Sequence, residues 1–143
     1  MTDKIVTDRK VLHQISKETT YKEVQDLNLI SRLVASNKTA WTDGAGLAAI
    51  QIGVPIRFAW YRVNGKEGTL LNPKIIESYG KQTVKEGCLS VLNKWKEISR
   101  AYEIVYLTNR KKKRARGFLA ELIQHEIDHM DGVLFDERQE MSH

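Results

Sequence analysis

The sequence predicts an α+β domain in which antiparallel strands surround a central helix. A helical pattern near the N-terminus is followed by a strand-rich middle, where short connections favour antiparallel pairing. A second helical pattern, at 117–130, has apolar residues over much of its circumference, which indicates a helix buried between sheets. The chain of 143 residues has the length of one domain, so we expect residues 1–143 to form a single domain.

The N-terminal helix is predicted over about 21–36. Thr20 can cap it and Glu23 can complete a capping box. The best strand segments follow at 56–63, 70–78 and 103–108, after a break in the chain at 44–46. The helix has one apolar face, expected to pack on the core, formed by Val24, Leu27, Ile30 and Val34.

Composition restricts the class of protein. Hydrophobic residues make up 41% and charged residues 29%, and no apolar run approaches the roughly 20 residues of a membrane span. The start of the chain has no signal-peptide core and no Arg- and Ser-rich transit sequence, so we expect the mature protein to begin there. The single cysteine, Cys88, excludes an intrachain disulfide and is typical of a reducing compartment.

Positive charge is concentrated in one segment. The net charge is +5, and six of the seven residues from Arg110 to Arg116 are Lys or Arg. One interpretation is a solvated hairpin tip, and the other is a patch that faces RNA.

The five residues His125-Glu126-Ile127-Asp128-His129 lie within the second helical pattern. Histidines four apart on a helix project from one face, one turn apart, and can share a metal ion. Glu126 then lies close enough to take a proton from water that the ion acidifies. The spacing also occurs by chance, with the imidazoles bonded to backbone or solvent. A buried helix favours the metal interpretation, since a buried ring needs a partner.

A third ligand is needed, because catalytic ions of this kind usually take three protein ligands. Cys88 is the best candidate, within Glu86-Gly87-Cys88-Leu89-Ser90; its alternative role is that of a small buried hydrophobe. A further block, 44–51, has small residues that allow tight packing and ends in Gln51, whose amide can donate to a substrate oxygen. It lacks the last glycine of a dinucleotide-binding fingerprint.

Together the three blocks resemble those of peptide deformylases, metallohydrolases that remove the formyl group from the N-terminal methionine of new proteins. That family has G-x-G-L-A-A-x-Q, E-G-C-L-S and Q-H-E-x-D-H in this order, matched here at 44–51, 86–90 and 124–129. The resemblance covers roughly residues 10 to 137. It implies one catalytic domain of the α+β fold described above, with the two histidines on the central helix.

The resemblance also implies a metal site and a mechanism. Cys88, His125 and His129 would hold one divalent ion, Fe²⁺ in the cell, with Zn²⁺, Ni²⁺ or Co²⁺ as replacements. Glu126 would be the general base for a metal-bound water nucleophile and would pass the proton to the leaving amine. The Gln51 side chain and the Leu89 backbone N–H would stabilise the oxyanion.

Other roles follow from the same resemblance. Glu86 would support the ligands from behind, with Arg100 as its partner. Glu121 falls where the family generally has an apolar residue, which leaves the side-chain preference of the pocket open. The implied substrate-binding residues are Gly46, with its backbone, and Gly87, Glu121 and Leu122.

The implied partners are N-formylmethionyl nascent peptides. We expect a monomer without membrane contact in the cytoplasm of a bacterium or a phage-infected host; an organelle is the alternative, although no transit peptide is visible. The chain ends soon after His129, before the long C-terminal helix with which many bacterial members contact the ribosome. The basic run Arg110–Arg116 is a candidate for that contact.

Two other classes of function stay open. A general metallopeptidase would use the same His-Glu-x-x-His spacing but would cleave internal peptide bonds without preference for formylated substrates. An inactive relative that acts as a binding module would have lost a ligand or the base, and the sequence retains all four groups.

Overall fold

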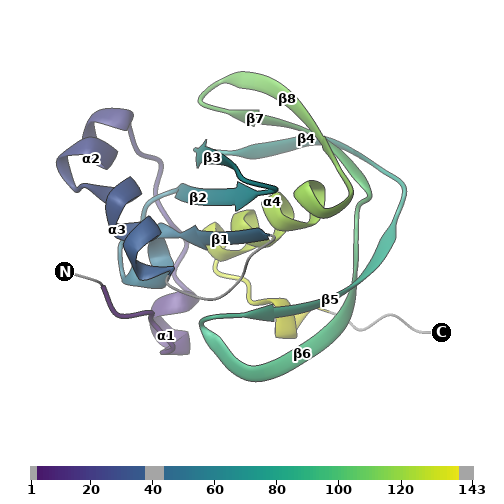
Figure 1. Ribbon diagram of the computed structural model, residues 1–143, viewed down its shortest axis with the longest axis horizontal. Helices are drawn as coiled ribbons and strands as arrows, with labels where there is room; N and C mark the ends of the chain where they lie inside the picture. The colour runs from purple at the N-terminus through teal and green to yellow at the C-terminus, as the bar shows by residue number, and fades with distance from the viewer. Residues whose placement is uncertain (1–2, 38–43, 139–143) are drawn as a thin grey trace.

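The computed structural model describes residues 3–37 and 44–138 (Figure 1). It confirms the α+β class with antiparallel strands. Within the described residues, no helix is both long and apolar enough to cross a membrane. The elements in chain order are α1 (Arg9–Leu12), α2 (Tyr21–Asp26), α3 (Leu29–Ser36), β1 (Gly44–Ala48), η1 (Ala49–Ile52), β2 (Phe58–Val63), β3 (Lys66–Leu71), β4 (Lys74–Tyr79), β5 (Gln82–Cys88), β6 (Val91–Arg100), β7 (Glu103–Thr108), β8 (Lys111–Arg116), α4 (Gly117–Met130) and η2 (Phe135–Glu137).

The strands form three sheets, with orders β1-β2-β3, β4-β7-β8 and β5-β6. The predicted strand 103–108 is confirmed as β7, and 56–63 begins two residues later as β2. The predicted strand 70–78 is wrong, because the segment divides between β3 and β4 of different sheets. At the break, Asn72 adopts φ 47°, which is not a strand conformation. Pro73 follows it and has no backbone N–H to donate to a neighbouring strand.

Helix α4 has the predicted bounds and is enclosed by strands, as Figure 1 shows. Its apolar residues Ala120, Ile123, Ile127 and Met130 share a buried cluster with β1, β2, β3, β7 and β8. Two of the sheets therefore hold this helix by apolar packing, and β5-β6 contacts it through the polar side chains of Cys88, Glu86 and Arg100.

The predicted helix over 21–36 is wrong in its continuity and its buried face. Asn28 adopts φ 53°, which ends α2 and starts α3 in a new direction. The buried residues are Val24, Leu29 and Leu33, whereas three of the residues expected to pack inward are exposed by 37–41% of their surface. Thr20 does cap α2, since its Oγ1 accepts from the Glu23 N–H at 3.2 Å.

The block at 44–51 also differs from expectation. Instead of only breaking the chain, it forms β1, paired with β2 in the register Gly46↔Tyr61, and then the short helix η1. The small residues here permit close packing of β1 on α4, which the sequence pattern alone does not reveal.

The basic run forms β8, the edge strand of its sheet, paired with β7. Lys111, Lys112, Lys113 and Arg114 are exposed, and Ala115 is buried. This agrees with the interpretation as a solvated hairpin, while contact with RNA stays a prediction.

Gly132 follows α4 and lies against the backbone of the N-terminal segment at His13. We expect this position to tolerate no side chain. It has φ +76°, and a Cβ would collide with the backbone carbonyl oxygen of His13. We expect Gly132→Ala to lower the free energy of unfolding by about 2–4 kcal/mol, from backbone strain and overpacking together, measured by urea denaturation. Gly65→Ala is the matched control, because Gly65 has φ +75° with open space around it. Equal losses in the two variants would contradict the prediction.

Candidate metal centre

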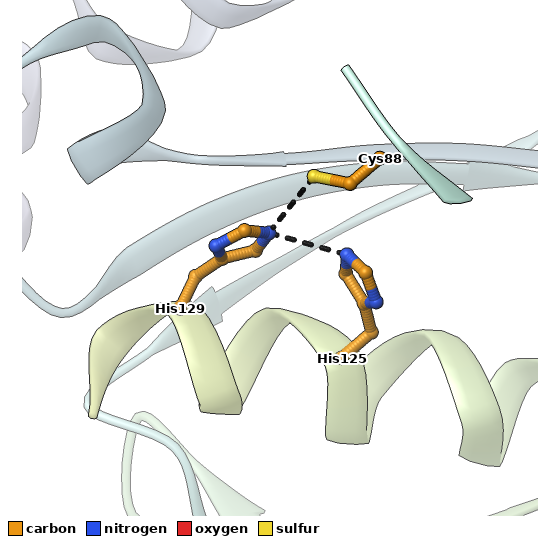
Figure 2. A group of neighbouring side chains, drawn as sticks. All are labelled: Cys88, His125 and His129. Atoms are coloured by element: carbon orange, nitrogen blue, oxygen red, sulfur yellow. Dashed lines mark hydrogen bonds between the residues drawn. The ribbon is translucent and has the colours of Figure 1, made fainter. Parts of the chain in front are cut away.

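The three predicted ligands converge on one point beside α4. His125 and His129 lie one turn apart on α4, and Cys88 ends β5. His129 Nε2 lies 3.4 Å from Cys88 Sγ and 3.1 Å from His125 Nε2 (Figure 2). All three ligand atoms lie within 4.8 Å of one another. The structure thus brings the predicted set together, and ligation itself stays a prediction.

A chain of buried charges orients His125. Its Nδ1 lies 2.8 Å from Glu86 Oε1, so an Nδ1–H donor leaves Nε2 free toward the cluster. Arg100 donates to both oxygens of Glu86, from Nε at 2.8 Å and from its second terminal nitrogen at 2.7 Å. Its remaining nitrogen donates to Asp128 Oδ2 at 2.6 Å. The predicted pairing of Glu86 with Arg100 is therefore present.

These contacts determine which groups carry charge. Burial acts to raise the pKa of Glu86, but hydrogen bonds from Arg100 and His125 outweigh it and lower that pKa to about 2. Burial likewise opposes ionisation of Cys88, yet the neighbouring His129 and His125 lower the pKa of its thiol well below the ordinary value. The thiolate is the form of cysteine that binds metals.

The donor set fits a divalent transition metal. One thiolate and two imidazole nitrogens are the ligand types of zinc and iron sites, and three such donors leave a position open for a reacting molecule. The buried Nδ1 of His129 has no hydrogen-bond partner among the described residues.

Glu126 is a buried carboxyl group beside the three ligands. It is 1% exposed, and its Oε1 has no hydrogen-bond partner within the described ranges. Burial raises the pKa of Glu126 above its ordinary value, against the opposing charges of His125 and His129. A Cβ at Gly46 would collide with Glu126 Oε2, so β1 approaches α4 this closely only with glycine there. The site thus holds a carboxyl group suited to accept a proton.

Gln51 lies against the cluster from η1. Its Oε1 accepts from the Ala48 N–H at 3.0 Å, which fixes the orientation of the amide. Its Nε2 donates to Ser90 Oγ at 3.1 Å and lies 3.4 Å from Cys88 Sγ. The predicted donor is therefore positioned at the cluster, although both of its hydrogens have partners inside the protein.

A pocket opens onto the cluster. The predicted residues Leu89, Gly46, Gly87, Glu121 and Leu122 all line it. Trp95 and Phe118 also line it, and sequence reasoning missed both. A Cβ at Gly87 would lie 2.8 Å from the Trp95 ring, so this glycine makes room for the indole.

The sequence is similar to that of known proteins. A model of the polypeptide deformylase family matches residues 2–143. The chain belongs to the polypeptide deformylase family. Peptide deformylase 1 of Bacillus subtilis is 49% identical over 100 residues, which are 65% of this chain and 62% of that protein. Peptide deformylase of Halothermothrix orenii is 41% identical over 132 residues, 87% of this chain and 84% of that one.

A solved structure supports the same assignment. The crystal structure of a peptide deformylase from Legionella pneumophila has a TM-score of 0.87 and 31% identity, and the match covers 97% of this chain and 86% of that one. The match to the Bacillus subtilis relative spans less than two thirds of that protein's length.

Two further residues of this family member have positions that sequence reasoning did not assign. Asp128 accepts from Arg100 and from Arg138, whose Nε lies 2.5 Å from Oδ2. Ser90 accepts from Gln51. Both lie inside the blocks that carry the resemblance, and that location was the available signal.

Proposed function

We propose that this chain is a metal-dependent peptide deformylase, which hydrolyses the formyl amide of N-formylmethionyl peptides. The observation that carries the proposal is the convergence of Cys88, His125 and His129 beside the buried carboxyl of Glu126, whose Oε1 has no partner among the described residues. Membership of the family supports it. In this proposal α4 is the central helix of the catalytic domain, residues 1–143.

Cys88, His125 and His129 would hold the ion. A divalent ion in this site supplies an acidified water molecule and polarises a carbonyl group. Glu86, fixed by Arg100, keeps the His125 ring in the orientation that presents Nε2.

Glu126 would hold and move the proton. Its Oε1 is free of other hydrogen bonds in the described part of the chain, so it can accept a proton from water and return it to the leaving amine. The Gln51 amide and the Leu89 backbone N–H would donate to the oxygen that becomes negative. Gln51 would exchange its contact with Cys88 Sγ for this one.

The peptide would bind as an added strand. Among the described strands, β1 pairs only with β2 and β5 only with β6, so each has one edge that no other described strand covers. Gly46 of β1 and Gly87 of β5 both line the pocket, where an extended peptide could bond to their backbones. The methionine side chain would lie among Leu122, Phe118 and Trp95, close to Glu121.

The test is formate release from formyl-Met-Ala-Ser by metal-loaded protein, with metal analysis of the same sample. We expect formate from this peptide and no cleavage of Met-Ala-Ser. Cleavage of internal bonds without formate would indicate a metallopeptidase, and tight peptide binding without any cleavage would indicate an inactive binding module. Cys88→Ala should lower the metal content together with the activity.

We further propose Fe²⁺ as the ion in the cell, with Zn²⁺, Ni²⁺ or Co²⁺ as replacements, because this donor set accepts several first-row ions. Protein purified without air should contain iron and lose activity on exposure to air. Equal and stable activity of the iron, nickel and zinc forms would contradict this assignment.

The proposed substrate also suggests a location and a partner. Formylated chains are made on ribosomes, so we place the protein in the cytoplasm, with ribosomal RNA against Arg110–Arg116. We also propose that it is a monomer. Lys111, Lys112, Lys113 and Arg114 are exposed, as a phosphate-binding strand requires.

Alanine at these four positions is expected to reduce co-sedimentation with ribosomes and to flatten its dependence on salt, since each lost phosphate contact reduces the slope by about 0.9. Alanine at the exposed Lys4, Lys10, Lys22 and Lys66 removes the same charge elsewhere and should have a smaller effect. Equal losses in the two variants would refute a contact through β8.

A further inference from the structure

Phe135 is a buried aromatic residue that the proposed chemistry does not use. It lies in η2, beyond the end of α4, and only 2% of its surface is exposed. Its ring stacks on the His125 imidazole, with the two ring centroids 6.2 Å apart and the two planes inclined by 28°. Aromatic rings attract each other at this separation when they are stacked with an offset. His125 therefore has an aromatic neighbour in addition to the carboxylate of Glu86.

A hydrogen bond from Nδ1 does not by itself fix the plane of an imidazole ring. His125 Nδ1 lies 2.8 Å from Glu86 Oε1, but the ring can still tilt about the line of this bond. A metal ion binds along the lone pair of the other nitrogen, which lies in the ring plane. A tilt of the ring would turn that lone pair away from Cys88 and His129, and a flat neighbour stacked on the ring opposes the tilt.

The Phe135 ring is itself held by packing. It shares a buried cluster with Leu12 of α1 and Ile98 of β6. Cys88, a second predicted ligand, packs against the same cluster. Phe135 therefore cannot move away from His125 without opening a cluster to which α1, β6 and the end of β5 all contribute.

Polar contacts of the next residue anchor the backbone of η2. The side chain of Asp136 is 4% exposed, and Arg9 of α1 donates to both of its oxygens, at 2.6 and 3.2 Å. Lys94 Nζ lies 3.1 Å from Asp136 Oδ2, and Lys96 Nζ donates to the Asp136 carbonyl oxygen at 3.0 Å. Both lysines belong to β6. The position of Phe135 is thus determined by α1 and β6 as well as by α4.

We propose that Phe135 is a positioning residue for the predicted metal ligand His125, and that the flat face of its ring, more than the volume it fills, is needed for tight metal binding. This inference rests on the metal site of the proposed function. An aliphatic side chain at this position would fill much of the same space but would present no flat surface to the imidazole. Loss of a group that orients a metal ligand typically lowers metal affinity by about 10–100-fold.

The experiment measures Co²⁺ binding to the full chain after a chelator has removed its metal. A thiolate ligand gives bound Co²⁺ a charge-transfer band in the near ultraviolet, and the visible bands report the coordination geometry. Phe135→Leu should weaken Co²⁺ binding by about tenfold or more and should alter the visible bands. Phe135→Tyr keeps the ring and should retain the wild-type affinity and spectrum.

Phe58→Leu is the matched control, because it makes the same substitution at an equally buried position in a different cluster. Phe58 is 0% exposed and packs with Val24 and Leu29, away from the three predicted ligands. Both leucine variants should unfold at lower urea concentration than wild type. Only Phe135→Leu should lose Co²⁺ affinity, since a moderate loss of stability does not change the affinity of protein that stays folded.

An unchanged Co²⁺ affinity in Phe135→Leu overturns the inference, as do equal losses of affinity in Phe135→Leu and Phe58→Leu or a loss in Phe135→Tyr. If Phe135→Leu does not fold, Phe135→Met makes the same comparison, because its flexible side chain adapts to the space. Wild-type protein that binds no Co²⁺ overturns the metal site of the proposed function first, and is a distinct result.

Discussion

Glu126→Ala is expected to lower kcat/KM for formyl-Met-Ala-Ser by about 10²–10⁴-fold, the usual contribution of a positioned general base. In the wild type, Oε1 of Glu126 is the only carboxyl oxygen among the described residues that is buried, without a partner and next to the three predicted ligands. Removing it takes away the proton acceptor and leaves Cys88, His125 and His129 in place. Metal content should therefore stay unchanged.

Stability distinguishes this loss from misfolding. The buried Oε1 of Glu126 has no partner among the described residues, which costs free energy in the folded state, so Glu126→Ala should unfold at the same or higher urea concentration than wild type. Glu126→Gln, which keeps the shape but not the base, should lose a similar share of activity. Glu67→Ala, at an exposed residue of β3, is the control and should change neither property. Substantial turnover by Glu126→Ala would show that another group takes the proton.

The grouping of Cys88, His125, His129 and Glu126 could be predicted because these residues lie in short blocks with fixed spacing. Two histidines four apart need only a helix to share an ion, and the apolar pattern over 117–130 predicted that helix with the correct bounds. The third predicted ligand, Cys88, followed from a motif and not from geometry, because the sequence does not show that β5 ends beside α4.

The errors have a common cause in local backbone conformation. The predicted helix 21–36 and strand 70–78 both continue through an asparagine, and Asn28 and Asn72 both adopt positive φ. Asparagine favours this conformation only mildly, so periodicity outweighed it in the prediction. Tertiary contacts determine the result: the Asn72 amide bonds to both the N–H and the carbonyl of Thr19, which lies far away in the sequence.

The sequence predicted Arg100 as the partner of Glu86, but it did not predict that Arg100 also bonds to Asp128. Its side chain is 1% exposed, and it bonds to two buried carboxylates, Glu86 and Asp128. Burial opposes its charge, yet these partners hold the pKa of Arg100 above the ordinary value. Arg100 is thus the buried cation that Glu86 and Asp128 share beside the candidate metal centre.

Arg100→Ala is expected to lower the free energy of unfolding by about 3–5 kcal/mol, because it leaves two buried carboxylates without their shared partner. Arg138→Ala is the matched control in urea denaturation. Arg138 also bonds to Asp128, but its side chain is 40% exposed, so its loss should cost about 1 kcal/mol or less. Similar losses in the two variants would mean that water, and not Arg100, satisfies these carboxylates.

The same substitution should also weaken metal binding, because Glu86 orients His125 only while Arg100 fixes it. Loss of such an outer partner typically lowers metal affinity by about 10–100-fold, which competition with a chelator can measure. Arg100→Lys separates the two effects: it keeps the charge that stabilises the fold but cannot donate to both oxygens of Glu86 and to Asp128 at once. It should therefore recover most of the stability and less of the metal affinity. Parallel recovery of both would mean that charge alone, without the geometry of the guanidinium, supports the site.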